Sequence, residues 1–187
     1  MLNVDTIRGW VREGHRFEYL LFWGHTQKRK GSPDASCLSQ WFPARFVVNG
    51  DVYPTAEHWM MAGKARLFED DAMLEAILDA ADPGKAKALG RKVRGFDEGR
   101  WREARGPLVV EGNVEKFGQN PALKQFLLKT GRDVLVEASP RDRIWGIGMG
   151  ASNEDARDPL KWRGTNLLGF ALMEARAALG GALGAPE

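Results

Sequence analysis

Cysteine is nearly absent from this sequence. Cys37 is the one cysteine among 187 residues, so the chain cannot form an internal disulfide. A run of 18 or more apolar residues is also missing, which excludes an ordinary membrane-spanning helix. The first ten residues include Asp5 and Arg8 and lack the apolar segment of a secretory signal. We therefore expect a cytoplasmic protein with no membrane partner.

A strong net charge is missing as well. Lys and Arg number 27 and Asp and Glu number 25, which gives a formal charge of +2. Nucleic-acid-binding domains usually carry a clear basic excess, so this balance does not by itself indicate one. Basic residues gather locally at 28–30, 100–105 and 141–143. Such clusters are solvated surface or contacts for phosphate.

The patterns that bind metal ions do not occur either. The three histidines, His15, His25 and His58, have no metal-ligand spacing, and the motifs H-E-x-x-H and C-x-x-C are absent. Cys37 has no base at a defined spacing, so we expect a thiol without catalytic use. The sequence thus predicts neither a metal site nor a cofactor.

The elements that the sequence does predict belong to the α+β class. The length suits one domain, and a hydrophobic content of 43% supplies a core. Asn49-Gly50 is a strong hairpin signal, and Thr55, Asp82, Asn120 and Asn166 precede helical patterns as candidate N-caps. We predict a single mostly helical domain around a small β-sheet. Its strands lie at 19–23, 46–48, 51–53 and 134–137, and its helices at about 55–67, 72–80, 83–89, 98–105, 109–117, 121–129 and 167–179.

One predicted helix carries two ionisable residues on one face. Glu57 and Lys64 are seven residues apart, so two turns separate them by roughly 10 Å along the axis. Their neighbours Trp59, Met60 and Met61 indicate a largely buried helix, and a buried charge needs a partner or a purpose. The alternative is an N-terminal acid and a surface lysine. We expect both side chains to reach one ligand.

Two later segments also suit a ribose-containing ligand. After the strand at 134–137, the chain continues with Asp142, Trp145 and glycines that include Gly148, which together provide a carboxylate, an aromatic plate and close backbone approach. A flexible loop is the alternative. Asn166 precedes the last helix, where it is either an N-cap or a contact for a phosphate or a ribose hydroxyl.

Eight segments in this order resemble the NADAR family, which includes bacterial N-glycosidases that act on riboflavin intermediates. The resemblance extends from Phe22 to Arg176. Gln40 stands where many relatives have asparagine, which adds a methylene at a position where we expect a substrate contact. The matching segments are Leu38–Pro43, Tyr53–His58, Met60–Ala65, Leu89–Arg91, Lys116–Asn120, Leu135–Ser139, Trp145–Gly148 and Gly164–Gly169.

The resemblance implies an N-glycosidase domain over residues 17–179, with an N-terminal extension at 1–16 and a flexible tail at 180–187. It implies hydrolysis of N-ribosides, either phosphoribosylamino-pyrimidine intermediates of riboflavin synthesis or ADP-ribose attached to guanine in nucleic acid. A non-catalytic module that binds ADP-ribose or NAD is the competing class. A small ribose-phosphate molecule is the expected partner, and nucleic acid is expected only as an ADP-ribosylated substrate.

These implications assign residues to roles. We expect Glu57, Lys64 and Asp142 to be catalytic, because a carboxylate stabilises the oxocarbenium-like state of N-glycoside cleavage. Lys64 can clamp a phosphate, set the ionisation of Glu57 or attack a ring-opened ribose. The predicted substrate contacts are Trp23, Ser39, Gln40, Phe42, Arg91, Trp101, Trp145, Gly148 and Asn166.

Overall fold

The computed structural model describes residues 2–28, 31–184 and 186. Part of the first basic cluster (29 and 30) and part of the predicted tail (185 and 187) lie outside the described residues. The described helices are α1 Val4–Arg12, α2 Ala56–Leu67, α3 Asp71–Leu78, α4 Pro83–Gly90, α5 Glu98–Gly118, α6 Pro121–Lys129 and α7 Leu167–Ala178, with short 3-10 turns η1 Ala35–Leu38, η2 Glu154–Arg157 and η3 Pro159–Lys161.

The strands form two small sheets. β1 (Tyr19–Phe22) pairs in parallel with β4 (Val134–Glu137), and Phe22 lies opposite Glu137 at the carboxyl ends of both strands. β2 (Phe46–Val48) and β3 (Asp51–Tyr53) form the predicted antiparallel hairpin. Asn49 and Gly50 have φ values of 51° and 89°, which is the left-handed backbone that this turn needs. The mostly helical α+β prediction is confirmed.

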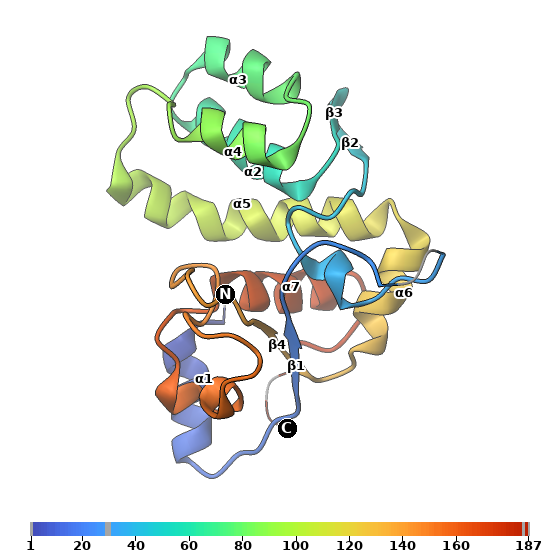
Figure 1. Ribbon diagram of the computed structural model, residues 1–187, viewed down its shortest axis with the longest axis vertical. Helices are drawn as coiled ribbons and strands as arrows, with labels where there is room; N and C mark the ends of the chain where they lie inside the picture. Colours follow the sequence, from blue (N-terminus) through green and yellow to red (C-terminus); the bar gives the residue numbers. More distant parts are fainter. Residues whose placement is uncertain (1, 29–30, 185, 187) are drawn as a thin grey trace.

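Helix α5 crosses the middle of the molecule and separates two groups of elements (Figure 1). Helices α2, α3 and α4 pack together on one side of it, and α7 lies on the other side against β4. Helix α7 is buried along most of its length, including Leu168, Phe170 and Met173, because it stands between α5 and the β1–β4 sheet. None of the described helices is both long and apolar enough to cross a membrane.

The start of α2 is fixed as the sequence predicts. The Thr55 side chain accepts a hydrogen bond from the His58 backbone N–H, which caps the helix. The same hydroxyl lies 2.8 Å from His58 Nδ1, and His58 Nε2 is 3.0 Å from the Ala80 carbonyl. His58 is therefore a buried structural residue. The capping of α4 by Asp82 is also confirmed, through a hydrogen bond from the Lys85 N–H.

Two other predicted N-caps are confirmed in position only. Asn120 and Asn166 occupy the N-cap positions of α6 and α7, but neither side chain makes a capping hydrogen bond. Asn120 Nδ2 instead donates to the carbonyls of Arg45 and Lys116. The helices predicted at 98–105 and 109–117 are one continuous helix, α5, which includes Pro107.

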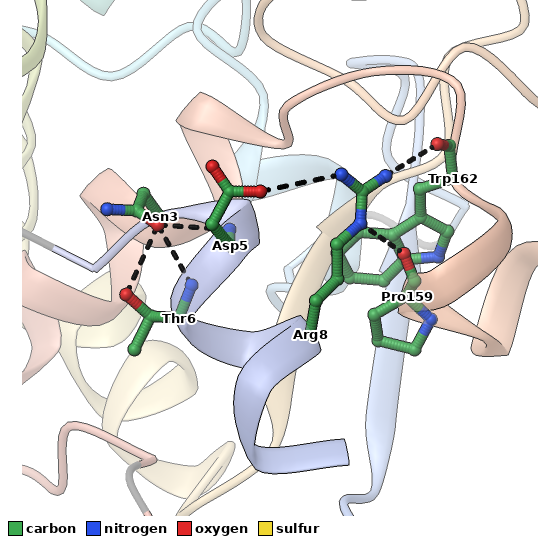
Figure 2. Close-up of polar contacts among 6 residues, drawn as sticks. All are labelled: Asn3, Asp5, Thr6, Arg8, Pro159 and Trp162. Carbon is green, nitrogen blue, oxygen red and sulfur yellow. Dashed lines mark hydrogen bonds and ion pairs between the residues drawn. The ribbon is translucent and has the colours of Figure 1, made fainter. Parts of the chain in front are cut away.

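The segment before residue 17 contains a helix that docks onto the rest of the fold. Asn3 caps α1 by accepting hydrogen bonds from the N–H groups of Asp5 and Thr6 (Figure 2). Arg8 then reaches across to η3, where its guanidinium donates to the carbonyls of Pro159 and Trp162, each at 2.9 Å (Figure 2). The predicted N-terminal extension is thus tied to residues that lie 151 and 154 positions later in the sequence.

The described part of the predicted tail is also anchored. Arg176, which is fully buried, donates to the carbonyls of Ala182 and Leu183 and to the Thr130 hydroxyl. Burial lowers the pKa of the Arg176 guanidinium, because a charged group loses hydration there. The flexibility predicted for 180–187 stays a prediction.

Candidate active site

A narrow pocket of about 60 Å³ lies between the start of α2, the carboxyl end of β4 and the segment after η1. It opens beside a wider hollow of about 520 Å³, with which it shares Lys87 and Asp142. Three carboxyl groups and three aromatic or amide side chains face this small volume. The lining residues are Ser39, Gln40, Trp41, Glu57, Met60, Lys87, Glu137, Asp142, Trp145 and Leu168.

Glu57 is buried in this pocket with part of its carboxyl group unpaired. Its side chain is 2% exposed, and no donor among the described residues reaches Oε1. Burial raises its pKa to about 7, the Asp142 charge adds to this, and Lys87 and a hydrogen bond from Trp41 oppose it. A buried, unsatisfied carboxyl oxygen is costly, so it indicates a site kept for a ligand rather than for stability.

Glu137 is a second carboxyl group of the same kind, and it was not among the predicted site residues. It ends β4 after three fully buried residues, and Oε2 has no partner among the described residues. Burial raises its pKa to about 8, and the charges of Asp142 and Glu57 add to the rise. The signal available in the sequence was a glutamate at the end of a buried strand.

Asp142 is the third carboxylate, and it organises the loop that follows β4. Its Oδ1 accepts hydrogen bonds of 2.8 Å from the N–H groups of Ile144 and Trp145. These bonds fix the backbone that carries Trp145, which also lines the pocket. Asp142 therefore contributes its negative charge and the position of an aromatic ring.

Basic side chains surround the wider hollow. Lys87, Arg141 and Arg143 line it, together with Asp142. Lys87 also faces the narrow pocket and lies 5.9 Å from the centre of the Trp41 ring. The sequence reasoning missed Lys87, because a lysine on a polar helix such as α4 gives no signal of its own. The carboxyl groups of Glu57, Glu137 and Asp142 thus form an acidic floor in the narrow pocket, and Lys87, Arg141 and Arg143 form a basic mouth in the wider hollow.

The predicted contacts Ser39 and Gln40 line the pocket. Ser39 Oγ accepts a hydrogen bond from the Trp41 N–H at 3.2 Å, which turns the chain so that the Trp41 side chain meets Glu57. Phe42 is different. It is 9% exposed and packs in the core near Lys116, whose ammonium is 5.9 Å from the centre of its ring.

Lys64 and Trp101 form a separate group. Lys64 Nζ donates to the Gly90 carbonyl at 2.9 Å and lies 4.1 Å from the centre of the Phe96 ring and 5.7 Å from that of Trp101. Burial lowers the pKa of this amine. The structure therefore does not bring Lys64 to Glu57 directly. Arg91, which follows α4, is close enough for its charge to lower the pKa of Glu57.

The remaining predicted contacts lie around the pocket or behind it. Trp23 is 66% exposed beside a hollow lined by Ala138 and Pro140. The Gly148 N–H is already used, because it donates to the Asp142 carbonyl at 2.9 Å. Asn166 is fully buried, accepts from the Glu137 N–H and donates to the Leu135 carbonyl. Asn166 thus holds β4, and with it Glu137, in place.

The glycines after β4 serve chain packing. A Cβ on Gly146 would lie 2.8 Å from the Glu137 carbonyl, and one on Gly164 would lie 2.3 Å from that of Gly146. These glycines let the two loops approach each other behind the pocket. Among the described residues, no group of three or more His, Cys, Asp or Glu is arranged to hold a metal ion.

Comparisons with known proteins show the family of this chain. The NADAR domain matches residues 21–180. A protein of Acanthamoeba polyphaga mimivirus named as an N-glycosidase is 42% identical over 164 residues, which cover 85% of this chain and 95% of that one. A protein of Vibrio vulnificus named as a riboflavin biosynthesis protein is 33% identical over 111 residues, 59% of this chain and 29% of that one.

A solved structure shares the fold. The NMR structure of the E. coli protein YbiA superposes with a TM-score of 0.70 at 26% identity, covering 88% of this chain and 86% of YbiA. The family match spans most of the chain, including every segment that builds the pocket. The chain therefore belongs to the NADAR family.

Proposed function

We propose that this protein is an N-glycosidase that hydrolyses the N-glycosidic bond of a ribose-phosphate compound. The observation that carries the proposal is the pair of buried glutamates, Glu57 and Glu137, which face one pocket with unpaired oxygens and raised pKa values of about 7 and about 8. Glycoside hydrolysis commonly uses two carboxyl groups, one protonated and one ionised. Relatives named as N-glycosidases support the same chemistry.

The two glutamates divide the work as follows. Ionised Glu57 stabilises the positive charge that develops on the anomeric carbon and ring oxygen, and it accepts a proton from the attacking water. Protonated Glu137 gives its proton to the departing nitrogen as the C–N bond breaks. The hydroxide equivalent adds to the anomeric carbon, so ribose phosphate and the free base are the products.

The basic mouth is suited to the phosphate. Lys87, Arg141 and Arg143 line the hollow outside the acidic floor. A dianionic phosphate is repelled by ionised Glu57 and Asp142 and attracted by these cations, so the ribose enters first and the phosphate stays at the mouth.

The proposed substrate class is the phosphoribosylamino-pyrimidines of riboflavin synthesis. The relative named as a riboflavin biosynthesis protein supports this choice. ADP-ribose on guanine remains the second candidate, favoured by the exposed Trp23 and the arginines at the mouth, which an extended nucleotide could contact. A pure binding module is less well supported, because binding alone does not require two buried acids with raised pKa values. We also propose a cytoplasmic location for the activity.

Lys64, Arg91 and Trp101 are proposed to contact the part of the substrate that extends beyond the pocket. Met60 lines the pocket and lies one turn from both Glu57 and Lys64 on the same face of α2. A ligand that follows this face from Glu57 would reach Lys64 and the rings of Phe96 and Trp101.

A hydrolysis assay read by mass spectrometry tests the proposal. Wild type, Glu57→Gln and Glu137→Gln are offered phosphoribosylamino-pyrimidines and an ADP-ribosylated guanine oligonucleotide. We expect wild type to release free base from one class and each variant to lose at least a hundredfold in rate. Glu103→Gln, at an exposed position on α5, is the matched control. Ligand binding without release from any substrate would favour the binding module.

A further inference from the structure

Two buried side chains of helix α5 hold the segment that contains Gln40. Lys116 is fully buried, and its ammonium donates to the carbonyls of Cys37 at 2.7 Å and Ser39 at 2.8 Å. One turn earlier, Asn113 is also fully buried and its Oδ1 accepts a hydrogen bond of 3.1 Å from Gln40 Nε2. The backbone carbonyl of Gln40 in turn accepts a hydrogen bond from the Glu57 N–H at 3.0 Å. Gln40 is thus fixed at both its backbone and its side chain.

The second hydrogen bond of Asn113 decides which way both amides face. Asn113 Nδ2 donates to the Val109 carbonyl at 2.8 Å, and a carbonyl oxygen can only accept. Asn113 must therefore turn its oxygen to Gln40, and Gln40 must turn its NH2 group to Asn113. The side-chain oxygen of Gln40, Oε1, therefore points away from Asn113. No donor among the described residues reaches it. It is absent from the fully buried atoms that lack a partner, so it keeps some contact with solvent. The solvent-accessible space beside Gln40 is the pocket that this residue lines.

We propose that Asn113 is a positioning residue, which locks the Gln40 amide so that Oε1 accepts a hydrogen bond from a donor group on the substrate. The inference rests on the proposed function and refines it. The donor is either a ribose hydroxyl or an N–H of the base, since both lie near a scissile N-glycosidic bond. Without Asn113, the amide would rotate freely and present NH2 as readily as oxygen.

This arrangement gives selectivity that a merely structural pair would not give. A substrate analogue that lacks the donor leaves Gln40 Oε1 unpaired in the site. A site that is built to pair with an O–H or N–H therefore rejects such analogues strongly. Replacement of Gln40 removes that penalty. A variant of Asn113 lowers it as well, because the rotated amide can then face the analogue with its NH2 group.

The experiment measures kcat/KM for each combination of an enzyme variant with a substrate analogue, so that the two changes can be compared as in a double-mutant cycle. Wild type, Gln40→Met and Asn113→Leu are compared on the parent riboside, its 2′-deoxy and 3′-deoxy forms, and a form with one amino group of the base replaced by a carbonyl oxygen. We expect one of the three changes to cost wild type tenfold or more beyond its cost to either variant. That change identifies the donor.

Two outcomes overturn the proposal. Equal losses on all analogues in wild type and in Gln40→Met would show that Oε1 accepts nothing from the substrate. An Asn113→Leu protein that is slower on every substrate by one common factor would show that Asn113 only supports the fold. Thermal unfolding of each variant, with Gln40→Leu/Asn113→Leu as the pair that leaves neither partner unsatisfied, separates misfolding from lost selectivity.

Failure of the proposed function is recognised separately. If wild type hydrolyses none of the ribosides, the same cycle is measured as binding of ribose 5-phosphate and its 2-deoxy and 3-deoxy forms by calorimetry. A loss of selectivity in Gln40→Met and in Asn113→Leu then supports the positioning role in a binding site, and unchanged selectivity contradicts it.

Discussion

Glu57 and Glu137 have the protonation chemistry that departs furthest from that of an ordinary glutamate. Their pKa values of about 7 and about 8 place both within one unit of neutrality, and burial is the largest cause of each rise. Between pH 7 and pH 8, the pair therefore retains about one proton. This is the state in which one group can act as an acid while the other acts as a base, and the two values belong to the pair as a whole.

We expect a narrow bell-shaped dependence of kcat/KM on pH, with limbs near 7 and near 8. Activity falls below pH 7 because Glu57 becomes protonated and can no longer support the cation. It falls above pH 8 because Glu137 loses the proton that the leaving nitrogen needs. Initial rates from pH 5 to pH 10 measure the profile, and a flat response between 6 and 9 would contradict the assignment.

Two variants of neighbouring charges should move this profile in opposite directions. The charge of Asp142 raises the pKa of both glutamates and that of Lys87 lowers both, so Asp142→Asn shifts the bell to lower pH and Lys87→Met shifts it to higher pH. The asparagine oxygen can still accept from the N–H groups of Ile144 and Trp145, so the loop is kept. Shifts of the same sign in both variants would show that the cause is not electrostatic.

Lys87 also tests where the phosphate lies. Lys87→Met should raise KM about tenfold for a ribose-phosphate substrate, since a charged hydrogen bond is lost. The same change should leave KM for the dephosphorylated riboside almost unaffected. Steady-state rates on the matched substrates measure this, and equal effects on both would place the phosphate away from the basic mouth.

At the scale of elements, α1 offers a prediction about docking. Arg8 makes two hydrogen bonds of 2.9 Å to carbonyls of Pro159 and Trp162 (Figure 2). Arg8→Met should lower the free energy of unfolding by about 1–2 kcal/mol, because both carbonyls lose a charged donor. Denaturant unfolding measures the change, with Arg12→Met at an exposed position of α1 as the control. Equal stability of the two variants would mean that α1 docks through apolar contacts alone.

Elements whose ends are set by neighbouring residues were predicted well. The hairpin at Asn49-Gly50, the start of α2 at Thr55 and the start of α4 at Asp82 each depend on a few adjacent residues. Asn120 and Asn166 stand at the predicted N-cap positions but make no capping hydrogen bonds, and their side chains instead bond to other segments. A local pattern carries no information about such distant partners.

Pocket residues were predicted only where they stood in a recognisable segment. Glu57, Asp142, Ser39, Gln40 and Trp145 were predicted, and all five line one pocket. Glu137 and Lys87 were missed, since their roles depend on the parallel pairing of β1 with β4 and on the packing of α4 against α2. Helical spacing placed Lys64 on the correct face of α2 but could not show that the Gly90 carbonyl holds its amine.

At the scale of the whole molecule, the raised pKa values oppose stability. A glutamate has a pKa near 4.5 when unfolded, so the folded state of this protein binds more protons than the unfolded state between that value and about 8. The stabilising contribution of these two groups is therefore fully present at low pH and is lost as the pH rises through 7 and 8. Burial lowers the pKa of Lys116 to about 7, so the unfolded state binds the extra proton above pH 7. Lys116 therefore makes the protein more stable as the pH rises above 7.

A neutral replacement separates these contributions. Glu57→Gln should be more stable than wild type by about 2–3 kcal/mol at pH 9 and nearly equal to it at pH 5, because only the ionised carboxylate is costly to bury. Lys116 is present in both proteins, so its effect cancels in the difference. Denaturant unfolding at both pH values measures the gain. A gain that is the same at pH 5 and pH 9 would arise from packing, and it would contradict the conclusion that this fold accepts instability in order to keep a buried carboxylate in its pocket.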